Sequence, residues 1–263
     1  MQDHGGFEHN VQSLRVVDYL EHPYPAFRGL NLTFELRESL IKHRTRYDKP
    51  PESPMQAELW AGGPQPPLEG QVANMADLIA YTLHDVEDGL LDGALDKDVL
   101  SRSALWQEAA ASVGPQSASL PLHAVRRPIL DAISHRMHED IRLETARRIE
   151  KAAVRGIDDV RRQDGELVGF SREMQAEADE LQALLMERLY RNHRVVRMDS
   201  KARRLIRELF EAYLAEPQLL PERFASRLAE QGPHRVICDY IAGMTDRFCQ
   251  EEHRRLFAPF HFD

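Results

Sequence analysis

The sequence predicts an all-α protein built as a bundle of helices, and three observations carry that prediction. Apolar residues recur at three- and four-residue steps over most of the 263-residue chain, which is the period of a helix with one buried face. Strict alternation of apolar and polar residues, the pattern of a half-buried strand, is nearly absent. Prolines and glycines fall between the periodic stretches, where helices end.

The first two helices are expected over residues 10–21 and from about residue 32 to His43. A His-Pro-Tyr-Pro segment stops the first helix, because proline removes a backbone donor and disfavours a helical residue before it. Either Asn31 or Thr33 can cap the second helix through its side-chain oxygen. Residues 48–68 hold six of the fifteen prolines, and we expect a long irregular loop there.

The remaining helices follow from apolar periodicity and from the turn residues that separate them. They are expected over 68–88, 122–155, 171–190, 199–214 and 233–257, with a short helix near 221–230. Gly89 and Gly93 should end the helix that starts at Leu68. The sequence shows no internal repeat and no low-complexity tract.

The composition and net charge of the chain argue against some classes of binding partner. Hydrophobic residues make up 42% and charged residues 29% of the chain, which is ordinary for a globular protein. The net charge of −9 argues against a broad nucleic-acid-binding surface, because neutralising phosphates needs excess Lys and Arg. A local basic pocket could still hold a small anionic substrate. No apolar run reaches the length of a membrane span, so no membrane partner is expected.

Cysteine usage and the first residues predict the compartment. Cys238 and Cys249 are expected on one helical stretch, about 16 Å apart, which is too far for a disulfide. They are therefore predicted as free thiols in a reducing compartment. The first twenty residues lack the apolar core of a signal peptide. We expect a cytoplasmic protein.

The helix predicted over 68–88 carries the most informative polar pattern. Asp77, Tyr81 and Asp85 stand at i, i+4 and i+8, so they project from nearly the same face and span about 12 Å. Ionised carboxylates suit hard divalent cations, and a phenol beside a second carboxylate suits a ligand rich in hydroxyl groups. On the pattern alone, the plainer alternative is a solvated face of an amphipathic helix.

Five segments, in order along the chain, resemble motifs of the bacterial dGTPase-like proteins of the HD-domain superfamily. They are GGFEHNVQSLRVV (5–17), GLNLTFELRESLIKH (29–43), LEGQVAN (68–74), ADLIAYTLHDVEDGL (76–90) and HRVICDYIAGMTDRFCQEEHRRLF (234–257). The resemblance implies an HD-domain-like multi-helix bundle. Residues 1–112 would form the carboxy-terminal part of the catalytic domain, and residues 113–263 would form a helical region packed on it.

The resemblance implies roles for three residues of the 68–88 helix. Asp77 matches a ligand of a divalent metal, for which Mg²⁺ or Mn²⁺ is expected. Tyr81 and Asp85 match positions that contact the sugar of the nucleotide. A phenol ring near the deoxyribose and a carboxylate that accepts from its 3′-OH would favour a deoxynucleotide.

Four further candidates come from the earlier segments. His9 matches a histidine near the phosphates and is the candidate catalytic residue, with a structural role as the alternative. Arg37 and Lys42 are candidate phosphate contacts. Asn31 is a candidate substrate contact, or a plain helix cap.

The family's own metal-binding histidine and His-Asp dyad lie upstream of the segment that resembles residues 5–17. Only Met1 to His4 precede it here, so we expect an N-terminally truncated product of a longer gene, with a genuine short paralogue as the alternative. Such a chain would bind its metal weakly or not at all, turn over nothing alone, and associate through exposed apolar surface. His84-Asp85 spells the motif on a different helix, and adjacent helical residues point about 100° apart, so this pair is not predicted as the dyad.

For the complete protein the resemblance implies hydrolysis of a deoxynucleoside triphosphate (dNTP) to the deoxynucleoside and inorganic triphosphate, by a homo-oligomer. Two alternatives stay open. One is a different HD-superfamily phosphohydrolase, which acts on another nucleotide. The other is a non-catalytic helical module that binds nucleotides or mediates oligomerisation.

Overall fold

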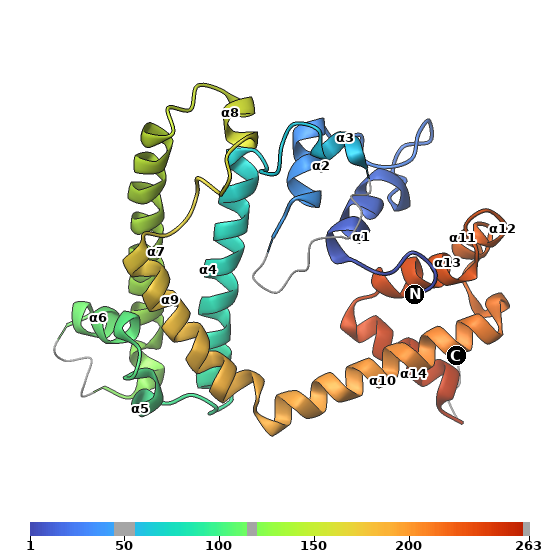
Figure 1. Ribbon diagram of the computed structural model, residues 1–263. Coiled ribbons are helices and arrows are strands. Elements are labelled where there is room, and N and C mark those ends of the chain that lie inside the picture. Colours follow the sequence, from blue (N-terminus) through green and yellow to red (C-terminus); the bar gives the residue numbers. More distant parts are fainter. Residues whose placement is uncertain (45–55, 115–119, 260–263) are drawn as a thin grey trace. The chain divides into compact units, whose positions relative to one another are not determined.

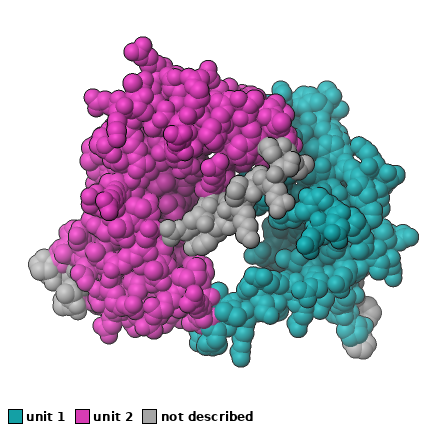
Figure 2. Space-filling view, in the orientation of Figure 1, with its two compact units in different colours: residues 1–31, 193–263 teal, residues 32–192 magenta. Residues whose placement is uncertain are grey.

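The computed structural model describes residues 1–44, 56–114 and 120–259, and all regular elements in these ranges are helical (Figure 1). The predicted all-α class is therefore confirmed. The chain divides into two compact units, coloured separately in Figure 2: unit 1 comprises residues 1–31 and 193–263, and unit 2 comprises residues 32–192. The predicted boundary at 112/113 falls inside unit 2. Among the described residues, no helix combines the length and the apolar composition that a membrane span requires.

Unit 2 is organised around three long helices, α4, α7 and α9 (Figure 1): α4 contacts both of the others, and Arg136 of α7 pairs with Glu177 of α9. Its elements are α2 (Phe34–Ile41), α3 (Ala57–Trp60), α4 (Leu68–Leu91), α5 (Lys97–Leu100), α6 (Ala104–Ser112), α7 (Leu122–Lys151), α8 (Ile157–Arg161), α9 (Arg172–Leu185) and the π-helical turn η3 (Met186–Tyr190). Helix α4 packs against α2, α7 and α9, and α6 packs against α7 and α9. Residues 48–55 of the predicted loop lie outside the described residues, and its remainder contains α3.

Two glycines let other segments approach α4 closely. A Cβ at Gly70 would lie 2.7 Å from the hydroxyl oxygen of Ser39, so glycine permits α2 to pack against the first turns of α4. A Cβ at Gly89 would lie 2.6 Å from Leu95. The helix continues through Gly89 to Leu91, and the expectation that Gly89 ends it is wrong, because this glycine is a packing contact.

Two buried polar side chains, Gln71 and Glu38, link segments of unit 2. The side chain of Gln71 accepts from the backbone N–H groups of Leu167 and Val168 at 2.7 and 3.0 Å, and donates to the carbonyl of Pro66 at 3.0 Å. Glu38 has no exposed side-chain surface and accepts from Lys42 and Arg161 at 2.6 and 2.7 Å. These bonds hold α2, α8 and the segments that flank α4 together.

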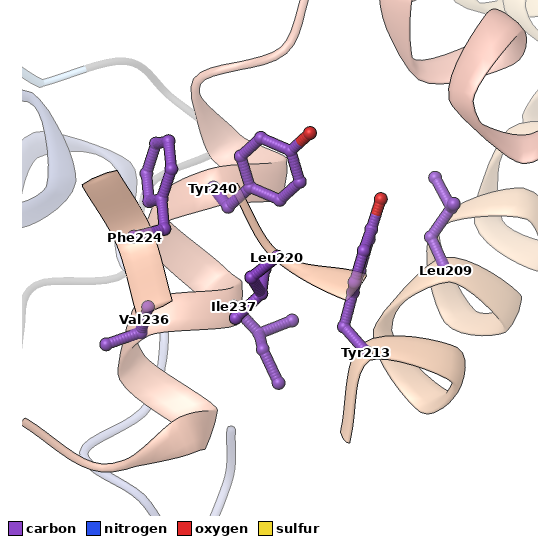
Figure 3. Close-up of a cluster of buried hydrophobic side chains, with 7 residues drawn as sticks. All are labelled: Leu209, Tyr213, Leu220, Phe224, Val236, Ile237 and Tyr240. Atoms are coloured by element: carbon purple, nitrogen blue, oxygen red, sulfur yellow. The ribbon is translucent and has the colours of Figure 1, made fainter. Parts of the chain in front are cut away.

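Unit 1 has its own apolar core. Its elements are α1 (His9–Arg15), the π-helical turn η1 (Val16–Leu20), α10 (His193–Ala215), η4 (Pro217–Leu219), α11 (Glu222–Ala225), α12 (Leu228–Gln231), α13 (Pro233–Ala242) and α14 (Asp246–Phe257). Figure 3 shows the core: Leu209, Tyr213, Leu220, Phe224, Val236, Ile237 and Tyr240. The Tyr240 ring lies 5.4 Å from Tyr213, edge to face, and 4.7 Å from Phe224.

A buried carboxylate joins α1 to α13 within unit 1. Asp239 is 1% exposed and accepts from Arg15 Nε at 2.8 Å and Nη2 at 2.7 Å, and from Gln12 at 3.2 Å. The hydrogen bond to Asp239 raises the pKa of Arg15. Arg227 lies nearby, with Nη1 3.9 Å from Asp239, and within the described residues its Nε and Nη1 make no hydrogen bond. Asp239 thus balances more than one cation.

The predicted helix over 233–257 is in fact two helices, so that prediction is wrong in one respect. The chain breaks at 243–245, and Thr245 caps α14 by accepting from the N–H of Phe248 at 3.2 Å. Cys238 and Cys249 consequently lie on different helices, and both are free thiols. Helices α5, α6 and α8 were not predicted.

Candidate functional site

Unit 2 contains a cavity of about 200 Å³ beside α4. Its lining comes from α4, from α9 and from two segments between helices: Arg44, Asn74, Met75, Asp77, Leu78, Tyr81, Glu166, Gln175 and Gln182. Asp77 and Tyr81 therefore reach the same cavity from one side of the helix. Their four-residue spacing produces this arrangement, since residues i and i+4 lie one above the other on a helix.

Tyr81 is held at its hydroxyl end by α9. Gln182 Nε2 donates to the Tyr81 oxygen at 3.0 Å, across 101 residues of sequence. Gln182 is itself buried, and its amide also lies 3.5 Å from the hydroxyl of Thr82. The phenol ring thus stands at the cavity wall with its oxygen bonded to the neighbouring helix.

Asp85 lies one turn beyond Tyr81 and does not line the cavity. Its carboxylate accepts a hydrogen bond from the hydroxyl of Tyr190, the last residue of η3. Burial raises the pKa of Asp85, and the bond from Tyr190 opposes that rise. Of the two residues predicted to face the sugar, one lines the cavity and the other sits beside it.

The opposite end of the cavity carries a chain of polar side chains that the sequence did not predict. Asn74 donates to a carboxylate oxygen of Glu166 at 3.3 Å, and its own oxygen lies 2.5 Å from His43 Nδ1. Burial raises the pKa of Glu166, while the Asn74 bond and the positive charges of Arg44 and His43 lower it. Asn74 stands three residues before Asp77 and could have been placed from helical spacing, whereas Glu166 is 92 residues away and could not.

Metal ligands do not gather around Asp77 in the part of the chain that the structure describes. Asp77 is exposed on α4, and among the described residues no group of three or more His, Cys, Asp or Glu is arranged to hold a metal ion. A hard divalent cation takes about six or more oxygen ligands, which come from carboxylates, water and substrate phosphates. Asp77 can contribute one carboxylate to such a site, and the described residues alone do not complete it.

The two predicted phosphate contacts, Lys42 and Arg37, lie in α2 and at its end. The Lys42 ammonium is completely buried, and its three donors reach Glu38 at 2.6 Å and the carbonyls of Gly63 and Gln65 at 2.8 and 3.4 Å. This geometry makes Lys42 part of the interior of unit 2. Arg37 is partly exposed and lies 3.9 Å from Glu58.

His9 and Asn31 belong to unit 1. His9 is the first residue of α1, half exposed, with Nδ1 3.0 Å from a carboxylate oxygen of Glu8, which caps the helix. Asn31 is exposed and has a φ of 55°, in the left-handed region. Thr33 is the residue that caps α2, so the alternative reading of Asn31 as that cap is wrong.

The described chain is thus an all-helical protein with a cavity along one long helix, and about a third of the chain matches a known type of region. Residues 168–255 match the phosphohydrolase-associated domain. Gln175, Gln182 and Tyr190 lie within that match.

Relatives extend the match to almost the entire chain. A deoxyguanosinetriphosphate triphosphohydrolase-like protein of Geobacter sulfurreducens is 40% identical over 260 residues, which is 99% of this chain and 67% of the relative. Proteins of the same name from Azoarcus sp. and Bordetella pertussis are each 43% identical, over 98% and 96% of this chain and 67% and 65% of their own lengths. The chain belongs to the family of deoxyguanosinetriphosphate triphosphohydrolase-like proteins, as its motifs predicted.

Proposed function

We propose that this chain functions in a dNTP triphosphohydrolase, an enzyme that cleaves a dNTP to the deoxynucleoside and triphosphate. The nucleotide would bind in the cavity along α4. The observation that carries the proposal is that Asp77 and Tyr81 line one cavity from one helix face. The names of the chain's relatives, triphosphohydrolase-like proteins, support the same function.

The sugar is the part of the nucleotide that this cavity is best suited to select. The Tyr81 ring would lie against the deoxyribose, where a 2′-hydroxyl would meet the ring. Asp85 would accept a hydrogen bond from the 3′-OH, through whichever carboxylate lone pairs Tyr190 leaves unused. A site that combines a hydrogen-bond acceptor with a steric wall can reject the wrong sugar more strongly than an apolar pocket could.

A divalent ion, Mg²⁺ or Mn²⁺, is the cofactor that the family resemblance implies, and when bound it would stabilise negative charge on the phosphates. Asp77 would give it one ligand. Because the described residues contain no group of three or more metal ligands, we assign to them the binding and orientation of the nucleotide, and no step at the metal. Self-association is expected on family grounds and a cytoplasmic location from the cysteine usage, and sedimentation velocity and cell fractionation would test them.

Isothermal titration with dGTP and with GTP, each with and without Mn²⁺, tests the proposal. Wild-type chain should bind dGTP more tightly than GTP, and Tyr81→Ala should remove most of that preference, whereas Tyr24→Ala, at an exposed tyrosine of unit 1, should not. A correctly folded chain that binds no dNTP from a panel of four would refute nucleotide binding.

Chromatography of the products then separates the rival functions. Release of triphosphate supports the proposed reaction. Release of phosphate or a nucleoside monophosphate would assign a different phosphohydrolase. Binding of a dNTP without any product would show that this chain binds the nucleotide but does not hydrolyse it alone, which is also what a nucleotide-binding module predicts.

A further inference from the structure

We propose that Gln182 and Tyr190 are positioning residues: Gln182 orients Tyr81, which lines the cavity, and Tyr190 orients Asp85, which lies one turn beyond it; these are the two side chains proposed above to contact the sugar. The inference rests on the proposed function of that cavity. Both residues lie within the matched span 168–255, so the proposal assigns to the start of the phosphohydrolase-associated region the role of orienting these two side chains.

Tyr81 and Asp85 each accept a hydrogen bond from the same continuous helical element, α9 with η3. Gln182 donates to Tyr81, and Tyr190 donates to Asp85. The donors are separated from their acceptors by 101 and 105 residues, so no local sequence preference creates these bonds. Helix α9 contacts α4 directly, and this packing brings both donors to α4.

The π-helical turn at Met186–Tyr190 allows one helical element to donate to both Tyr81 and Asp85. Eight residues of regular α-helix would rotate Tyr190 about 80° away from Gln182, at about 100° per residue. A π-turn closes its hydrogen bonds at i→i+5, so each residue advances by a smaller angle and much of that offset disappears. Such turns are uncommon, and they occur often at functional sites.

The chemistry of each bond suits a positioning role. Gln182 is 7% exposed, and its amide is satisfied by the phenol oxygen, which fixes the height of the Tyr81 ring in the cavity. Tyr190 occupies only one of about four acceptor positions of the Asp85 carboxylate, and it stabilises the ionised form that can accept from a sugar hydroxyl. The other groups that act on Asp85 are Asp88 and His84, both on α4.

Tyr190→Phe removes one hydroxyl group and tests the proposal. We expect dGTP to bind about 2- to 10-fold more weakly, as for the loss of one hydrogen bond. The pKa of Asp85, followed in the nucleotide-free chain by the carboxyl carbon resonance, should rise, because the bond that opposes the effect of burial is gone. The acid limb of the dGTP affinity profile should move to higher pH by the same amount. A merely structural tyrosine would not produce these linked shifts.

Controls separate positioning from damage to the fold. Tyr24→Phe should leave the dGTP affinity and the Asp85 pKa unchanged. In an Asp85→Asn background, Tyr190→Phe should cost no further affinity, because the group that it positions is no longer ionisable. Gln182→Met, which keeps the side-chain length, should weaken dGTP binding without moving the Asp85 pKa.

The outcomes distinguish this proposal from the proposed function. An unchanged Asp85 pKa in Tyr190→Phe overturns the positioning role, whatever the nucleotide does. A wild-type chain that binds no dNTP, with an Asp85 pKa that still rises in Tyr190→Phe, overturns the nucleotide function and leaves the Tyr190–Asp85 contact standing. A raised pKa together with unchanged dGTP affinity shows that the contact does not serve binding, and also overturns the inference.

Discussion

Replacing Glu38 by glutamine should destabilise unit 2 more than any single change at its surface. The carboxylate of Glu38 is fully buried and neutralises two cations at once, Lys42 at 2.6 Å and Arg161 at 2.7 Å. Glutamine keeps the shape of the side chain but removes the charge. Arg161 retains a bond to Asp158 at 3.1 Å, whereas Lys42 keeps only two backbone carbonyls.

The size of the effect follows from leaving buried charge uncompensated. Removing one partner of a buried ion pair costs about 3–5 kcal/mol. For a unit of this length, 1 kcal/mol corresponds to about 2–4 °C in Tm, so the loss should be roughly 6–20 °C. The cost is limited because Lys42 can release its proton.

The pH dependence provides a second, independent check. Burial already lowers the pKa of Lys42, against the pull of Glu38, and Glu38→Gln should lower it further. In the variant, the unfolded chain then binds more protons than the folded chain as the pH approaches the ordinary lysine pKa of about 10.4. Stability rises with pH under that condition, so the gap between variant and wild type should narrow from pH 7 towards pH 9–10.

Tryptophan fluorescence in a urea titration reports this unit alone, because Trp60 and Trp106 are the chain's two tryptophans and both lie in unit 2. Glu35→Gln is the matched control, since Glu35 is an exposed residue one turn earlier on α2. A loss below about 1 kcal/mol for Glu38→Gln, or an equal loss for Glu35→Gln, would refute the argument from buried charge.

Three further changes test other parts of the fold. Asp239→Asn should destabilise unit 1 by about 3–5 kcal/mol, because Arg15 loses its buried counter-ion; the near-ultraviolet tyrosine signal would follow it. Gln71→Leu should cost unit 2 about 2–6 kcal/mol in urea, because the N–H groups of residues 167–168 each lose their acceptor at about 1–3 kcal/mol. Glu166→Gln should raise Tm at pH 7.5 and leave it unchanged near pH 4. Burial raises the pKa of Glu166, so its contribution is fully present at acidic pH and is lost as the pH rises through that value.

Each of these predictions has a result that contradicts it. Equal stability of Asp239→Asn and wild type would mean that the ion pair contributes nothing net. A Gln71→Leu chain as stable as wild type would mean that water reaches the freed N–H groups. A Glu166→Gln variant less stable than wild type at pH 7.5 would reverse the sign of the burial effect.

The long helices could be predicted because each has one face buried against neighbours, which imposes a helical period on the sequence. Helices α4, α7 and α9 were placed to within a few residues. Short elements carry too few residues for a period to emerge, so α5 and α8, of four and five residues, were missed. The break between α13 and α14 was also missed, although Thr245 followed by Asp246 has the form of a helix start.

In the candidate site too, residues that share one helix could be predicted, and residues brought together from distant segments could not. Asp77 and Tyr81 were placed together by a spacing within one helix, which the sequence contains directly. The groups that bond to this part of α4 are Glu166 at Asn74, Gln182 at Tyr81 and Tyr190 at Asp85, and they come from segments about ninety to a hundred residues away. Their positions depend on how α9 packs against α4, and nothing in the local pattern of either segment encodes that contact.

Lys42 lies inside one of the family motifs, and all three bonds of its ammonium group are made within the interior of unit 2. Two of its three bonds go to the carbonyls of Gly63 and Gln65, in the segment that leads directly into α4 at Leu68. The third goes to Glu38, which also holds Arg161. Because a helix is rigid over its first turns, fixing the approach to Leu68 also fixes the rotation of α4, and therefore the direction in which Asp77 and Tyr81 project. A cation at this position is explained by the two carbonyls and one carboxylate that it satisfies in the interior, where an unpaired backbone acceptor would be costly.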